Sequence, residues 1–352
     1  MKKLLSAPHY KRRNTKKSED ALKILRKRKD KVMTPKPGSS FSKILYENKL
    51  LRRNDATPTI NVKAPENFSL VHNADETIAF FEKAHSEIRK GNKIILNINH
   101  ITTLTTDAIA VQIAKIKDRR FHLNRPIIGN APKDMALKKL FLQSGFYDHV
   151  TSAGYKPQNN NRLLIHKITT NKVEPKLAKE ACLLGLRHVF NNEDIFEPLY
   201  DILIEIMQNT NNHAGKTKGK YDWWLYVYNH PDENKTSYTF LDLGVGIFES
   251  LSVQTFKRNI LEALGLVSNL ELVEKLFNGE IKSRTARPER GKGIPQVFEC
   301  SQDPIFTKFY LVANDIHADL KSRNYRHINH NFEGTLFHWE IENIQTENIH
   351  GN

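Results

Sequence analysis

The chain has 352 residues, a hydrophobic content of 39% and a formal net charge of +15. This length is sufficient for two domains with real cores, and the hydrophobic content is typical of a globular protein. No apolar run approaches the roughly 18 residues of a membrane helix, and the basic N-terminus leads into no signal-peptide core. Cys182 and Cys300 are far apart and form no metal or disulfide pattern. We therefore expect a cytoplasmic protein with no membrane partner.

The positive charge is concentrated at the N-terminus. Up to residue 55 there are 18 Lys and Arg residues against 5 Asp and Glu residues, which places 13 of the 15 net positive charges there. Residues 1–58 are predicted to form a basic, partly disordered arm, with a helix over part of residues 18–32. Through residues 1–55 such an arm can bind nucleic acid phosphates without sequence preference. The alternative is a solvated tail that aids solubility or docks an acidic protein.

The next region, residues 59–160, alternates predicted strands with predicted helices. Residues Lys93–Asn99 read as a buried strand, and Ala108–Lys117 carries apolar residues at helical spacing. A second strand is expected at Pro126–Gly129, followed by a helix over Met135–Leu142 that ends near Gly145. This alternation predicts a small α/β domain.

Two threonines, Thr105 and Thr106, lie at the turn between the first of these strands and its helix. Together with the later sequence Leu-Phe-Leu-Gln-Ser-Gly-Phe, this pattern resembles STAS domains, which are protein partners of anti-sigma-factor kinases. The resemblance implies that Thr105 or Thr106 could accept a phosphoryl group. The alternative, a helix cap without chemistry, is favoured because hydroxyls are common at helix starts.

A helix with one polar face is predicted in the third region, residues 161–345. Glu205, Asn209 and His213 are four residues apart, so on a helix they project from one face. The other face would be buried through the apolar residues Leu199, Leu203, Ile206 and Met207. Asn209 can supply an oxygen to Mg²⁺, and Glu205 can deprotonate a water molecule or a hydroxyl. An ordinary solvated helix face is the alternative.

A buried strand follows and ends at Asp242, in the sequence Asp-Leu-Gly-Val-Gly. The Asp242 carboxylate can accept a hydrogen bond from an amine such as that of adenine. Gly244 and Gly246 allow the backbone to approach a flat ring or to adopt positive φ. A plain strand-to-loop turn would have the same sequence.

Another glycine pair precedes a predicted helix start at Pro295. Gly291 and Gly293 alternate with Arg290 and Lys292, and glycine amides at a helix start favour anions. A strand beginning Gly-Thr at residues 334–335 closes the region.

These four stretches, in this order, resemble the ATP-binding domains of the GHKL superfamily, which includes histidine kinases and anti-sigma-factor kinases. The resemblance implies a two-layer α/β sandwich of the GHKL (Bergerat) type that binds ATP and Mg²⁺. It makes Glu205 the catalytic residue and Asn209 the metal ligand. It assigns nucleotide contacts to Asn209, His213, Asp242, Gly244, Gly246, Arg290, Gly291, Lys292, Gly293 and Thr335.

The same resemblance implies a mobile lid from Phe248 to Glu289, whose cations Lys282, Arg284 and Arg287, with Arg290, are suitable for phosphate oxygens. An exposed basic loop is the alternative. Glutamate at position 205 and His-Ala at 213–214 are most similar to the anti-sigma-factor kinases. We therefore expect an ATP-dependent switch, ATPase or Ser/Thr protein kinase that acts on a protein partner, with a homodimer possible from the family. The alternative is a nucleic-acid-associated ATPase that uses its basic arm.

Overall fold

The computed structural model describes residues 57–150, 162–168, 173–213, 222–252, 268–280 and 293–343. The expected basic arm and its helix lie outside these residues. The chain divides into two compact units, residues 1–58 and residues 59–352. Every element discussed below belongs to the second unit. None of the described helices is long and apolar enough to cross a bilayer.

The first part of this unit, called here the N-terminal layer (residues 59–150), contains a three-stranded parallel sheet in the order β1-β3-β5. Its strands are β1 (Thr59–Lys63), β3 (Lys93–Asn97) and β5 (Ile127–Gly129). Two helices follow the first two strands, α4 (Ala74–Arg89) and α5 (Thr106–Lys117). The remaining elements are the short parallel pair β2 (Asn67–Phe68) and β4 (Thr103–Leu104), α6 (Arg119–His122), α7 (Met135–Gln143) and a 3₁₀ turn (Phe146–Asp148).

These elements confirm the α/β alternation predicted from the sequence, with boundaries shifted by one to two residues. Helix α5 is more deeply buried than an amphipathic pattern suggests, because all nine residues from Thr106 to Ala114 are buried. A helix that is covered on most sides must pack against more than one layer. The N-terminal layer supplies one of these neighbours and a second sheet supplies the other.

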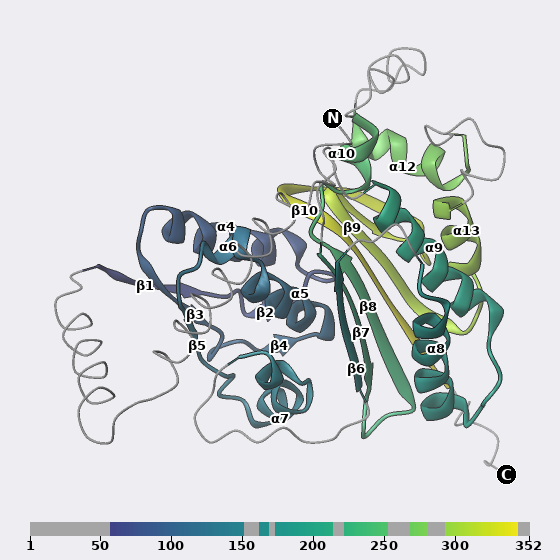
Figure 1. Cartoon of the computed structure of the whole chain (residues 1–352), viewed down its shortest axis with the longest axis horizontal. Helices are drawn as coiled ribbons and strands as arrows, with labels where there is room; N and C mark the ends of the chain where they lie inside the picture. The colour runs from purple at the N-terminus through teal and green to yellow at the C-terminus, as the bar shows by residue number, and fades with distance from the viewer. Residues whose placement is uncertain are drawn as a thin grey trace, which may run out of the picture. The chain divides into compact units, whose positions relative to one another are not determined.

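The second sheet has five strands in the order β6-β7-β8-β10-β9, and every neighbouring pair is antiparallel (Figure 1). Its strands are β6 (Arg162–Ile168), β7 (Asp222–Asn229), β8 (Lys235–Asp242), β9 (Phe306–Asp319) and β10 (Asn324–Glu342). Helices lie along one face of the sheet in Figure 1: α8 (Pro175–Phe190), α9 (Glu197–His213) and α13 (Gly293–Ser301). The short helices α10 (Ile247–Ser252) and α12 (Asn269–Phe277) lie near one end.

The two faces of the sheet belong to two hydrophobic clusters. On β8, Tyr238 and Phe240 face α8 and α9, while Leu241 belongs to the cluster that the sheet shares with the N-terminal layer. Helix α5 packs on β7 and β8 across this second face. The sheet and its helices thus form an α/β pair of layers, and the N-terminal layer covers the remaining face. Residues 59–150 and 162–343 consequently share a core.

Two expectations for the segment after Asp242 need correction. Helix α13 begins at Gly293, two residues before the expected start at Pro295. Part of the expected lid belongs to the core, since Phe248 is fully buried and α12 buries Leu272, Val273, Leu276 and Phe277. These apolar side chains stabilise the helix layer, so they are not a freely moving loop. The cationic part of the expected lid, Lys282, Arg284 and Arg287, lies outside the described residues.

Candidate functional site

Helix α9 presents the polar face that its sequence predicts. Leu199, Leu203, Ile206 and Met207 are at most 1% exposed and anchor the opposite face in the core. Glu205 and Asn209 are half-buried on the polar face. The side chain of His213 lies outside the described residues, although its backbone forms the end of α9.

Asp242 ends β8 as predicted, and its carboxylate is buried among hydrogen-bond donors. Its Oδ1 accepts a hydrogen bond of 2.8 Å from the backbone N–H of Gly244, and its Oδ2 accepts one of 3.4 Å from the hydroxyl of Thr210. Thr335 lies directly opposite Asp242 in the β8–β10 register and also donates to the carboxylate. Burial raises the pKa of Asp242 to about 6, although these three donors lower it. The carboxylate therefore gains from any further donor that a ligand brings.

Thr210 is a site residue that the sequence interpretation missed. It follows Asn209 on α9 and points to Asp242 rather than along the Glu205 face. One signal could have found it: Thr210 follows Asn209 directly, so on a helix it points toward a different side, where the sheet packs against the helix.

Two glycines shape the backbone around Asp242. Gly246 has φ +84° and Gly334 has φ +125°, conformations that residues with a side chain rarely adopt. A β-carbon on Gly334 would lie 2.1 Å from the carbonyl oxygen of Asp242. The sequence Gly-Thr therefore brings β10 against the end of β8 in a way that another residue would block.

Gly293, the first residue of α13, lies against the polar face of α9. A β-carbon there would lie 3.0 Å from Asn209 Nδ2 and 3.0 Å from Glu205 Oε2. Gln296 on α13 donates a 3.0 Å hydrogen bond to Asp201 on α9, which fixes the two helices together. Arg290, Gly291 and Lys292 lie outside the described residues.

The polar groups beside Gly293 are incompletely satisfied. Burial raises the pKa of Glu205, and the neighbouring charge of Asp201 raises it further. Asn209 Nδ2 is buried, and no hydrogen-bond partner for it is found in the described part of the chain. Buried side-chain amides are normally paired, and either end of the amide can occupy that position. With its oxygen turned there, Asn209 fits a hard cation such as Mg²⁺, which needs few protein ligands when phosphates and waters complete its shell.

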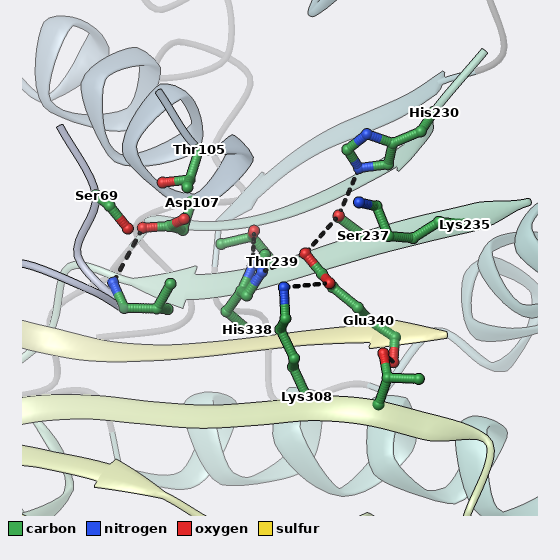
Figure 2. Close-up of polar contacts among 12 residues, drawn as sticks. Ser69, Thr105, Asp107, His230, Lys235, Ser237, Thr239, Lys308, His338 and Glu340 are labelled. Atoms are coloured by element: carbon green, nitrogen blue, oxygen red, sulfur yellow. Dashed lines mark hydrogen bonds and ion pairs between the residues drawn. The ribbon is translucent and has the colours of Figure 1, made fainter. Parts of the chain in front are cut away.

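The second candidate, the turn at Thr105 and Thr106, has a different geometry from the expected cap. Thr105 occupies the N-cap position of α5, but its side chain makes no capping hydrogen bond. Its hydroxyl instead donates to the Phe68 carbonyl at 3.5 Å. Thr106 is buried. The adjacent Asp107 carries the local hydrogen bonding, because its Oδ2 accepts from Leu70 N at 2.6 Å and from Val71 N at 3.3 Å. Figure 2 shows Asp107 beside Thr105 and Ser69.

A polar network crosses the sheet face that the N-terminal layer covers (Figure 2). His230 Nε2 and the Ser237 hydroxyl are 2.7 Å apart, Ser237 donates to Glu340 at 3.4 Å, and Lys308 pairs with Glu340 at 3.0 Å. Burial lowers the pKa of His230 to about 4, so the ring is neutral at pH 7. Ser237 is only 1% exposed. The network therefore links polar side chains of β8, β9 and β10 within the fold.

Four stretches that are distant in sequence thus meet at the Asp242 end of the sheet. Thr210 and Gly334–Thr335 surround Asp242, while Gly293 lies on Glu205 and Asn209. No known protein family has a model that matches this chain, and no curated protein matches it. The geometry defines a cluster of polar groups at one end of an α/β fold, and this cluster is the candidate ligand site.

Proposed function

We propose that this site binds ATP together with Mg²⁺, in the manner of the GHKL superfamily, and that the protein is an ATP-dependent regulator of a protein partner. The observation that carries the proposal is the convergence of Asp242, Asn209 and Gly293 at one end of one sheet. Of these residues, Asn209 has a buried side-chain amide nitrogen without a hydrogen-bond partner in the described part of the chain, and a nucleotide with its metal would supply one. The basic arm lies outside the described residues and lends no observation to the nucleic-acid alternative.

Asp242 is suited to recognise adenine. Its carboxylate is fixed by Gly244 and Thr210 and is nearly removed from water, with an exposed fraction of 4%. The exocyclic amine of adenine is a donor that a buried carboxylate can accept, whereas guanine presents a carbonyl at the equivalent position. Specificity of this kind is strong because guanine would place its carbonyl oxygen against the buried carboxylate, where adenine places a donor.

Asn209 and the start of α13 are suited to the phosphates and their metal. A bound Mg²⁺ would neutralise phosphate charge, with Asn209 as its protein ligand. Gly293 begins a helix of nine residues, and the unpaired N–H groups of a helix start favour an anion. The absence of a side chain at Gly293 allows the start of α13 to lie directly against Asn209 and Glu205. Arg290 and Lys292, which precede Gly293 in the sequence, are positively charged residues.

Glu205 is suited to act as a general base. Burial and the charge of Asp201 raise the pKa of Glu205. A general base is more effective when its pKa lies nearer the working pH, so this shift favours proton uptake. Glu205 would hold the proton of an attacking water in an ATPase or of a protein hydroxyl in a kinase. Both reactions use the same carboxylate, so the group that receives the phosphoryl group, water or a protein hydroxyl, decides between them.

Equilibrium titration with Mg-ATP and Mg-GTP tests the proposal. We expect the wild type to bind ATP at least about tenfold more tightly than GTP. Asn209→Ala should weaken binding and remove its dependence on Mg²⁺, while Gln208→Ala, the preceding residue on α9, should leave both unchanged. Equal affinities for the two nucleotides, or Mg²⁺ dependence that survives in Asn209→Ala, would contradict the assignment.

A further inference from the structure

The residue after Asp242 is anchored in the N-terminal layer. Leu243 is 2% exposed, and its side chain lies in the hydrophobic cluster that the sheet shares with that layer. Its carbonyl oxygen accepts a 2.7 Å hydrogen bond from Arg120 Nη2, across 123 positions of sequence. Its N–H donates to the Asp222 carbonyl at 3.3 Å. Two consecutive residues at the end of β8 therefore contact different layers. Asp242 lies in the candidate site, and Leu243 contacts the N-terminal layer.

Arg120 is held in the orientation that this contact needs. Its Nε lies 3.1 Å from both carboxylate oxygens of Asp118, and its Nη2 lies 3.0 Å from Asp118 Oδ2. Asp118 is itself 8% exposed and accepts the backbone N–H of Arg120 at 2.9 Å, which starts α6. A guanidinium that Asp118 already holds through Nε and Nη2 loses little further entropy when it binds the carbonyl.

A second contact reaches the other segment that borders Asp242. The Lys115 ammonium lies 5.9 Å from the ring centre of Phe121 and 6.0 Å from that of Phe332. Phe332 is buried and precedes Gly334 and Thr335 on β10. Burial lowers the pKa of Lys115, whereas the charge of Glu333 raises it. The end of α5 and the start of α6, residues 115–121, thus contact both segments around the carboxylate, and we call them the α5–α6 corner.

We propose that the α5–α6 corner positions the chain at Asp242 and Leu243, with Arg120 as the positioning residue. In this way the N-terminal layer affects the affinity for nucleotide. This inference rests on the proposed function for its ligand, but the positioning itself does not. The Arg120 contact fixes the Leu243 carbonyl, and through the backbone it fixes the direction of the Asp242 carboxylate.

The test uses the full chain and three variants, Arg120→Ala, Arg120→Lys and Arg119→Ala. Arg119 is the exposed neighbour and serves as the matched control. Because Arg120 is 55% exposed, we expect a modest effect, about a fivefold loss of Mg-ATP affinity in Arg120→Ala. Arg120→Lys, which keeps a charged donor, should recover at least half of the loss on a logarithmic scale, and Arg119→Ala should match the wild type. Should Arg120→Ala fail to fold, Asp118→Asn, which removes the partner that orients Arg120, replaces it.

Hydrogen exchange without nucleotide provides a readout that does not depend on the proposed function. Arg120→Ala should speed exchange of the Leu243 and Gly244 amides and leave the amides of α8 unchanged. Nucleotide affinity equal to wild type in Arg120→Ala would overturn the coupling while the proposed function stands. If the wild type binds no nucleotide, the proposed function fails, and exchange alone decides: faster exchange supports the positioning role, and unchanged exchange overturns it.

Discussion

Gly293, the first residue of α13, lies directly against Asn209 of α9. A β-carbon on Gly293 would lie 3.0 Å from Asn209 Nδ2 and 3.1 Å from Asn209 Oδ1. Such distances are tighter than ordinary packing, yet the contacted atoms are ends of side chains that can move. The close approach therefore allows little room for any side chain between the two helices.

Gly293→Ala should reduce nucleotide binding more than it reduces stability. The added methyl group would push Asn209 and Glu205 from their positions, and a displacement of a metal ligand costs about tenfold or more in affinity. The free energy of unfolding should change by less than about 1 kcal/mol, since the higher helix propensity of alanine offsets part of the cost of the close contact. Titration with Mg-ATP and chemical denaturation measure the two effects. Gly129→Ala is the control, because its β-carbon would meet only Leu96 O at 3.6 Å. Equal losses of affinity in both variants would contradict the role of Gly293.

Gly334→Ala should destabilise the fold itself. The residue has φ +125°, and its β-carbon would lie 2.1 Å from Asp242 O and 3.2 Å from the α-carbon of Leu243. The contacted atoms are backbone, which cannot turn aside, so we expect a loss of about 3 kcal/mol in the free energy of unfolding. Urea denaturation checks this value. A loss below about 1 kcal/mol would show that the β8–β10 contact is looser than the structure indicates.

The polar face of α9 and the strand that ends at Asp242 could be predicted from the sequence because both depend on local spacing. Leu199, Leu203, Ile206 and Met207 repeat at helical intervals, and all are buried. A short β-rich run before an aspartate and two glycines likewise specifies its own strand end. In the N-terminal layer the same periodicities located β3, β5, α5 and α7.

Asp242→Asn should stabilise the protein at neutral pH while it weakens nucleotide binding. The folded-state pKa of about 6 lies above the usual 3.8, so the folded protein holds the proton more tightly. Stability from this group is present at low pH and falls as pH rises from about 4 to about 6. Asparagine avoids that loss, because its oxygen can accept from Gly244 and its amide can donate to Thr210. We expect a gain of about 1–2 kcal/mol at pH 7.5 that shrinks toward zero at pH 4.

Denaturation of both proteins at the two pH values measures this difference, since other titrating groups cancel between them. The opposite result is a variant that is less stable than the wild type at pH 7.5, by an amount that does not change with pH. It would show that the Asp242 carboxylate is stabilised in its ionised form without a ligand. In that case its burial would give no reason to expect a donor from adenine.

Asp107→Ala should cost about 2–3 kcal/mol in the free energy of unfolding, because the N–H groups of Leu70 and Val71 would be left buried without an acceptor. Thr105→Ala at the same turn should cost less than about 0.5 kcal/mol, since its hydroxyl caps no helix N–H. Urea denaturation of both variants checks the contrast. A Thr105→Ala loss of about 1 kcal/mol or more would restore the cap interpretation.

The contacts that join distant segments could not be predicted in this way. Thr210 with Asp242 and Arg120 with Leu243 depend on how layers pack, and no spacing in the sequence specifies that. One signal was present, however. Residues Trp223–Tyr228 of β7 form an unbroken apolar run, which is typical of a strand buried on both faces. It indicates that a second layer covers the sheet, as the N-terminal layer does.

The most direct test of the account is a calorimetric titration of the wild type and Asp242→Asn with ATP and Mg²⁺ at pH 7.5. The account predicts one saturable site in the wild type and at least about tenfold weaker binding in the variant, which stays folded. Binding of equal strength in both proteins, or no binding by the wild type, would contradict the assignment of Asp242 as the residue that recognises adenine.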